Sequence, residues 1–229
     1  MHSRYFDMDH PFYMLDWLNY MDSQRLEKYA DALLQCKAGG IPIEPEPSYN
    51  TVFRCFSFFK PQDTKVVLLG QDPYPDGSAT GLAFANRADK TPISQSLRVL
   101  KDSVLSLVDS KESPIFDQTL ESWAKQGILL LNSALTVKRG QPGSHTEAWK
   151  PFIERLITGL SADTNCCFLL FGKQAWEFTN CIFDKERGVF YEYHPAYYSR
   201  CGKQMPGDIW KKMLDYVSEV FGTTIRLYE

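Results

Sequence analysis

The sequence lacks the spacings that mark common metal, redox and dinucleotide sites. Its six cysteines form no C-x-x-C pair, which argues against a zinc site or a redox dithiol. No G-x-G-x-x-G follows the first predicted strand, so a dinucleotide-dependent enzyme is not indicated. Only Asp72 and Asp76 follow the predicted strands as carboxylates, which makes a metal-dependent nuclease a poor fit. We therefore expect neither a metal nor another cofactor, and we expect the thiols to be reduced structural residues.

Long apolar runs and targeting signals are also missing. No stretch is apolar over the ~20 residues that a membrane-spanning helix needs. Residues 1–20 hold Asp7, Asp9 and Asp16 and show no basic region followed by an apolar stretch, so a secretory signal is not expected. We expect an intracellular, cytoplasmic protein, or a nuclear one in a eukaryotic or viral setting.

Positive charge is in short supply overall, but it is concentrated locally. The formal net charge is −3, which counts against nucleic acid as a partner. Three segments nevertheless carry cations and no acid, and the distribution of charge matters more than its sum. They are residues 132–146 with Lys138 and Arg139, residues 164–176 with Lys173, and residues 193–207 with Arg200 and Lys203.

Apolar residues, 44% of the chain, follow two alternating patterns. Short, two-sided apolar runs predict buried strands, and apolar positions three or four residues apart predict helices. Residues 41–50 contain three prolines and predict an extended connection. Strands are predicted at 65–69, 128–131, 166–171 and 189–193, and helices at 11–36, 94–108, 117–126, 147–161, 173–182 and 207–221.

This alternation predicts the fold class. We expect a single α/β domain over residues 1–229, in three α/β/α layers around a mostly parallel four-stranded sheet. Residues 1–50 would form an N-terminal helical and extended segment, and residues 51–229 the α/β core. A length of 229 residues fits one such domain.

Polar side chains follow each predicted strand. Asp72, Asn132, Lys173 and His194 come directly after the four apolar runs in turn. The carboxyl ends of parallel strands share one edge of the sheet, where α/β proteins place their ligand crevice. We therefore expect Asp72, Asn132 and His194 to meet in one cleft, with the acid-free segments around it.

These residue types suit cleavage of a bond from a sugar carbon to a base nitrogen. A carboxylate such as Asp72 can stabilise an oxocarbenium-like sugar and position a water. A neutral imidazole such as His194 can donate a hydrogen bond to the oxyanion that develops on the base. The amide of Asn132 can read a base edge, and Phe84 or Tyr74 can stack on a flat ring.

Each of these residues, taken singly, also has a structural interpretation. Asp72 could be a turn or cap residue, Asn132 a turn former, and His194 a loop histidine. Phe84 could belong to the core. The pair Lys138-Arg139 could be a solvated surface.

The same positions resemble the motifs of the family-1 uracil-DNA glycosylases. Residues 70–74 (GQDPY) are similar to that family's water-activating motif, and residues 81–84 (GLAF) to its stacking segment. Residues 130–137 (LLNSALTV) follow the family closely, and His194-Pro195 resembles the start of its DNA-intercalation loop. The likeness covers roughly residues 15–225, and four motifs in order are a specific signal.

The resemblance implies a role for each matching residue after the base has been flipped from the helix. Asp72 would activate or position the water, and His194 would stabilise the uracil oxyanion. Tyr74 would exclude the methyl group of thymine. Uracil would further be bound by Gln71, Phe84 and Asn132, and DNA by Pro73, Ser94, Ser96, Lys138, Arg139, Lys173, Pro195, Tyr197, Tyr198, Ser199 and Arg200.

Four substitutions depart from the family pattern, at positions that concern the binding of DNA, the wedge in the duplex and the choice of base. Pro75 replaces the histidine that usually follows the tyrosine, and Lys173 stands where a serine is common. In the intercalation loop, Ala196 replaces a serine and Tyr198 an intercalating leucine. Tyr197 and Tyr198 could still stack in the gap of a duplex.

Three functions remain in competition. The leading one is a monofunctional uracil-DNA glycosylase of base excision repair. The second is a glycosylase for another modified pyrimidine, suggested by Pro75, and the third a catalytically silent DNA- or partner-binding relative. The expected partners are uracil-containing DNA, single- or double-stranded, and a proteinaceous uracil-glycosylase inhibitor. We expect a monomer and no contact with membranes.

Overall fold

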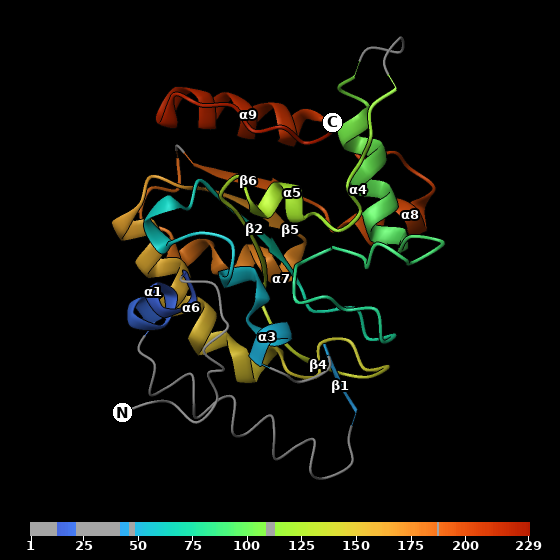
Figure 1. The fold of residues 1–229 in the computed structure, drawn as a ribbon, viewed down its shortest axis with the longest axis horizontal. Coiled ribbons are helices and arrows are strands. Elements are labelled where there is room, and N and C mark those ends of the chain that lie inside the picture. Colours follow the sequence, from blue (N-terminus) through green and yellow to red (C-terminus); the bar gives the residue numbers. More distant parts are fainter. Residues whose placement is uncertain (1–12, 22–41, 46–48, 109–112, 187) are drawn as a thin grey trace.

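A four-stranded parallel sheet forms the centre of the protein. The computed structural model describes residues 13–21, 42–45, 49–108, 113–186 and 188–229. The sheet consists of β2 (Val66–Gly70), β3 (Ile128–Asn132), β5 (Cys167–Phe171) and β6 (Val189–Glu192). Their order is β3-β2-β5-β6, and every pair is parallel (Figure 1). The register pairs Gly70 with Asn132, so the ends of β2 and β3 lie side by side.

Helices cover both faces of the sheet and confirm the predicted three-layer α/β/α class. On one side lies α9 (Asp208–Phe221), and on the other lie α1 (Tyr13–Met21) and α6 (Thr146–Asp163) (Figure 1). Every residue of β2, β3 and β5 is buried, because both faces of these strands are covered. The edge strand β6 is only half-buried.

Two further helices and a small antiparallel pair lie near the carboxyl edge of the sheet. Two helices, α4 (Gln95–Leu105) and α8 (Pro195–Cys201), pack together there. A small antiparallel pair, β1 (Ile43–Glu44) with β4 (Val137–Lys138), lies below them in Figure 1. The short elements are α3 (Tyr49–Val52), η1 (Arg54–Phe56), η2 (Pro61–Asp63), α5 (Glu121–Ala124), α7 (Lys173–Trp176) and η3 (Glu177–Cys181).

Buried tryptophans anchor the layers to one another. Trp210 of α9 packs on Phe171 of β5, with ring centroids 5.8 Å apart, and on Trp123 of α5 at 5.5 Å. On the opposite side, Trp17 of α1 packs on Phe56 at 5.0 Å. Each of the three tryptophans is fully buried. Burial of such large rings supplies much of the hydrophobic stabilisation of a core.

Two predicted helices are wrong in extent. The segment 117–126 is helical only over α5, because the Asp117 carboxylate accepts hydrogen bonds from the Thr119 and Ser122 amides and holds a turn there. Leu120 then adopts a positive φ of 53°. The segment 173–182 splits into α7 and the 3-10 helix η3. The Thr179 hydroxyl donates to the Trp176 carbonyl at 2.7 Å and competes with α-helical pairing.

Other differences concern the N-terminal segment and the cysteines. The extended connection predicted at 41–50 contains β1 and the start of α3. Of the helix predicted at 11–36, the structure describes α1, and residues 22–36 lie outside the described residues, as do residues 1–12 and Cys36. The five described cysteines are free. Among the described residues, no helix has both the length and the apolarity that a membrane crossing requires.

Candidate active site

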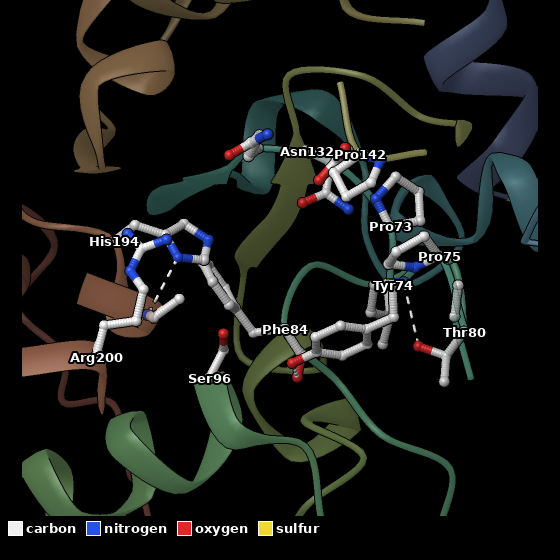
Figure 2. Close-up of a pocket in the computed structure, with 16 residues that line it drawn as sticks. Pro73, Tyr74, Pro75, Thr80, Phe84, Ser96, Asn132, Pro142, His194 and Arg200 are labelled. Atoms are coloured by element: carbon white, nitrogen blue, oxygen red, sulfur yellow. Dashed lines mark hydrogen bonds between the residues drawn. The ribbon is translucent and has the colours of Figure 1, made fainter. Parts of the chain in front are cut away.

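A pocket of about 360 Å³ opens at the carboxyl edge of the sheet (Figure 2). It brings together three residues that are far apart in the sequence: Asp72 after β2, Asn132 at the end of β3, and His194 between β6 and α8. The residues that the resemblance assigns to uracil binding also line this pocket. Its walls are Gln71, Asp72, Pro73, Tyr74, Pro75, Ala79, Thr80, Gly81, Leu82, Phe84, Ser96, Asn132, Pro142, His194, Ala196 and Arg200.

The Asp72 carboxylate is held by a main-chain donor from a distant loop. The amide of Gly143 donates to Oδ2 of Asp72 at 2.5 Å. The loop itself is fixed, because the Gly140 amide donates to the Pro75 carbonyl at 2.9 Å. Burial raises the pKa of Asp72, and the hydrogen bond from Gly143 opposes that rise. Within the described part of the chain, Oδ1 has no hydrogen-bond partner and can hold a water.

The imidazole of His194 is neutral and presents a donor to the pocket. Burial lowers its pKa to about 4, and the positive charge of Arg200 adds to the effect. Its Nδ1 accepts a hydrogen bond from the Ala196 amide at 3.2 Å. In a neutral imidazole the proton is then on Nε2. Gly172 makes room for this side chain, since a Cβ there would lie 2.9 Å from the His194 Cβ.

An amide and an aromatic ring lie between these two groups. Asn132 and Phe84 are 8% and 7% exposed, so both are largely shielded from solvent although they line the pocket. The Phe84 ring is 5.5 Å from His194 and 5.6 Å from Phe171. A Cβ on Gly70 would lie 2.7 Å from Asn132 Oδ1 and 3.1 Å from a Phe84 ring atom. The absence of a side chain at position 70 therefore allows the amide and the ring to lie close to the main chain of β2.

Two hydrogen bonds hold the hydroxyl group of Tyr74 in place. The hydroxyl donates to the Phe84 carbonyl at 2.9 Å and accepts from the Ser94 hydroxyl at 2.6 Å. Burial raises the pKa of Tyr74 to about 12. A neutral, immobile ring of this kind forms a rigid wall (Figure 2). Such a wall can exclude a ligand whose ring carries an additional group on the side that faces Tyr74.

Comparison with known proteins decides the family. Residues 56–218 match the family model described as the uracil DNA glycosylase superfamily. The chain belongs to this superfamily. It is 42% identical over 142 residues to the uracil-DNA glycosylase of Epstein-Barr virus, with 61% of this chain and 54% of that protein covered. For the equine herpesvirus 2 enzyme the figures are 37% over 171 residues, with 73% and 65% covered.

A bacterial relative matches over more of its own length. The chain is 34% identical over 176 residues to the uracil-DNA glycosylase of Ureaplasma parvum, with 76% of this chain and 81% of that protein covered. By contrast, it spans less than two thirds of the two herpesvirus enzymes. These relatives support membership of the superfamily.

Solved structures of the superfamily share the fold. The mimivirus uracil-DNA glycosylase superposes with a TM-score of 0.79 at 22% identity, with 93% of this chain and 86% of that chain covered. A variant of the mimivirus protein solved in complex with UGI gives 0.81 at 21% identity, with 97% and 91% covered. At this identity the likeness concerns the fold alone.

The predicted DNA-binding residues of this superfamily member fall into three groups. Pro73, Ser96 and Arg200 line the first pocket. Lys173 and Tyr197 line a second pocket beside it. The remaining residues line neither pocket. Of these, Pro195 is buried in the first turn of α8, Ser199 is half-buried on α8, and Lys138 is half-buried on β4.

Three of the residues predicted to contact DNA are already engaged within the protein. The guanidinium of Arg139 donates to Glu44 at 2.7 Å, and the Glu44 side chain is only 3% exposed. The hydroxyl of Ser94 donates to Tyr74. Tyr198 is 7% exposed and its hydroxyl donates to Glu192 at 2.5 Å, so its ring is not placed to enter a duplex in this conformation. A wedge role would require this ring to leave its buried position, and the role stays a prediction.

Sequence reasoning missed contributors whose role depends on the main chain. Gly143 reaches Asp72 through its backbone amide, and such a donor has no side-chain signature. Pro142 and Thr80 line the pocket from loops without a regular pattern. The signal that was available is the spacing of Gly140 and Gly143 in an acid-free loop. Among the described residues, no group of His, Cys, Asp and Glu side chains is arranged to hold a metal.

Proposed function

We propose that this chain hydrolyses the N-glycosidic bond between uracil and deoxyribose in DNA and leaves an abasic site for base excision repair. The observation that carries the proposal is one pocket shared by a carboxylate and a neutral imidazole, Asp72 and His194. Membership of the superfamily supports the choice of reaction. The wall formed by Tyr74 supports uracil over thymine as the base.

In this proposal the two groups act on opposite charges of the same transition state. As the bond from C1′ to N1 breaks, its electron pair moves to the base and positive charge develops on the sugar. The Asp72 carboxylate stabilises the sugar and positions a water, whose oxygen adds to C1′ while its proton leaves to solvent. The Nε2–H of His194 donates to the oxyanion on the base. Phe84 supports the flipped ring and Asn132 pairs with its polar edge.

The partners and cellular setting belong to the same proposal. We infer uracil-containing DNA as the substrate, bound by the cations around the pocket. A proteinaceous inhibitor is a further partner, by analogy with the mimivirus protein solved in complex with UGI. We also propose a single domain over residues 1–229, a monomer and an intracellular site of action.

The first experiment measures uracil release from an oligonucleotide with a single uracil. Asp72→Asn keeps an oxygen acceptor for the Gly143 amide but removes the negative charge, so we expect release to fall about a thousandfold. Asp76→Asn is the matched control, because Asp76 is paired with Lys90 and does not line the pocket. Wild type and Asp76→Asn should release uracil at similar rates.

Two outcomes would contradict this proposal. If the wild type binds DNA but releases no uracil, a panel of modified pyrimidines tests the second candidate base. If nothing in that panel is released, the chain is a catalytically silent binder. Equal loss of activity in both aspartate variants would point to disturbed loop structure instead of a role for Asp72 in the reaction.

A further inference from the structure

A second pocket of about 470 Å³ adjoins the first on the side of α7 and α8. Gln71, His194 and Arg200 line both pockets, so the two are neighbours at these side chains. The second pocket has a volume typical of sites for small ligands. A polymer that places one unit in the first pocket can therefore place its next unit in the second.

The outer wall of this second pocket is aromatic. The ring of Tyr193 stacks on that of Tyr197, with centroids 4.7 Å apart and planes inclined by 29°. Trp176 supports Tyr193 from another side at 5.5 Å. Tyr193 is 46% exposed although it belongs to this cluster. A braced and exposed ring offers its face to a flat ligand with little loss of conformational entropy.

The same pocket also carries positive charge and an unused polar atom. Lys173 and Arg200 line it, and neither takes part in an ion pair in the described part of the chain. Oε1 of Gln174, another lining residue, is buried and has no hydrogen-bond partner among the described residues. Cations suit phosphates, aromatic faces suit bases, and a free acceptor suits the polar edge of a base. Together they match a nucleotide.

We propose that the second pocket binds the nucleobase next to the target uracil on the same strand, packed against the stacked pair of Tyr193 and Tyr197. This inference rests on the proposed function and specifies its substrate. A base in this position has left its own helical stack. Unstacking and unpairing a base is costly in a duplex and nearly free in a single strand. Strands whose flanking base is unpaired are thus the preferred substrates.

The test combines substitutions in the protein with removal of one base from the DNA. The substrates are single-stranded oligonucleotides with one uracil and either thymine or an abasic analogue at the 5′ or the 3′ neighbouring position. For the wild type we expect loss of the base at one of these positions to lower kcat/KM about tenfold. Tyr193→Ala should lower kcat/KM for the intact strand by a similar factor and be insensitive to the missing base.

Two further variants separate stacking from general damage. Tyr193→Phe keeps the ring and should keep the tenfold sensitivity to the missing base. Tyr191→Ala is the matched control, because Tyr191 is 47% exposed on β6, two residues before Tyr193, and also contacts Trp176, but does not line the pocket. Its sensitivity should equal that of the wild type. Melting temperatures of all variants report whether the fold is intact.

The outcomes distinguish this inference from the proposed function. If the wild type releases uracil equally well with and without each flanking base, the proposed function stands and the subsite is overturned. The subsite is also overturned if base removal costs the wild type and Tyr193→Ala the same factor. If the wild type releases no uracil, the proposed function fails. The affinity of Asp72→Asn for the same oligonucleotides, with and without each flanking base, then tests the subsite without turnover.

Discussion

At the scale of single residues, Gly70 shows how closely the pocket is packed. A methyl group at this position would come within 2.7 Å of Asn132 Oδ1 and displace that amide. Because the amide is the end of a side chain, it can move away, and the fold should lose little stability. We expect Gly70→Ala to reduce kcat/KM for uracil release by about a hundredfold, the value of one or two lost hydrogen bonds.

A parallel melting experiment serves as the control for Gly70→Ala. Overpacking of this kind costs about 1–3 kcal/mol, so the variant should remain folded at room temperature. Activity that stays within twofold of the wild type would show that the Asn132 amide has space to adapt or takes no part in recognition.

The two central ionisable groups predict the pH dependence of the reaction. Asp72 must be ionised, and burial raises its pKa, so activity is present above that pKa and is lost as the pH falls through it. His194 must be neutral, and its pKa is lowered to about 4, so it stays neutral over the whole physiological range. We expect kcat/KM between pH 5 and pH 8, about the range where histidines usually titrate, to show no inflection from His194.

The measurement is a pH profile of kcat/KM together with an NMR titration of the His194 ring. Arg200→Ala should raise the pKa of His194, because it removes a neighbouring positive charge. An acid limb near the ordinary histidine value that disappears in His194→Gln would contradict the neutral role of this side chain.

At the scale of elements, the pair β1–β4 fastens the loop that holds Asp72. Arg139 follows β4 and pairs with Glu44 of β1, whose side chain is almost fully buried. The loop that begins there supplies the amides of Gly140 and Gly143. Arg139→Ala leaves a buried carboxylate without its partner, and we expect it to lower the free energy of unfolding by about 2 kcal/mol. A reduced kcat should accompany this loss.

Lys138→Ala is the matched control for Arg139→Ala, since Lys138 has no ion pair within the described residues. Its stability should stay within about 0.5 kcal/mol of the wild type in urea titrations. If Arg139→Ala instead keeps its stability and binds DNA with a weaker salt dependence, then Arg139 contacts phosphate as its position in an acid-free segment first suggested.

Elements with a clear apolar pattern could be predicted from the sequence, and α8 shows where the pattern is insufficient. The four strands were predicted within one or two residues, because buried parallel strands are continuous apolar runs. Residues 195–201 contain no such pattern and were predicted as a loop. Two signals of a helix were nevertheless present. Pro195 occupies its first turn, and Gly202 ends it in the left-handed conformation.

At the scale of the whole molecule, positive charge gathers at the second pocket although the net charge is negative. The net charge is −3, yet Lys173 and Arg200 line the second pocket without an ion pair among the described residues. We expect the affinity for single-stranded DNA to fall steeply with salt. Each of Lys173→Ala and Arg200→Ala should reduce the slope of log K against log salt by about 0.7.

Lys211→Ala is the control for these slopes, because Lys211 is exposed on α9, and no residue of α9 lines either pocket. Its slope should equal that of the wild type. Equal slopes for all three variants would mean that DNA follows a different path across the protein.

The long-range partners of the site could not be predicted from the sequence. The convergence of Asp72, Asn132 and His194 follows from strand ends alone, since parallel strands share an edge. The contact of Gly143 with Asp72 joins residues 71 positions apart through the main chain. The burial of Tyr198 depends on the packing of α8 against its surroundings. Neither has a local pattern in the sequence.

The order of the strands sets how freely each loop can vary. In the order β3-β2-β5-β6, the strand that carries Asp72 has a neighbour on both sides, and the strand before His194 has one. A change of length or shape after β2 would disturb loops on two sides, whereas a change after β6 disturbs one. The departures at residues 196–198 occur at this less constrained edge. Here the protein can alter how it holds a DNA strand while the chemistry at Asp72 is left unchanged. New substrate preferences should therefore arise at the edge of the sheet before they arise at its centre.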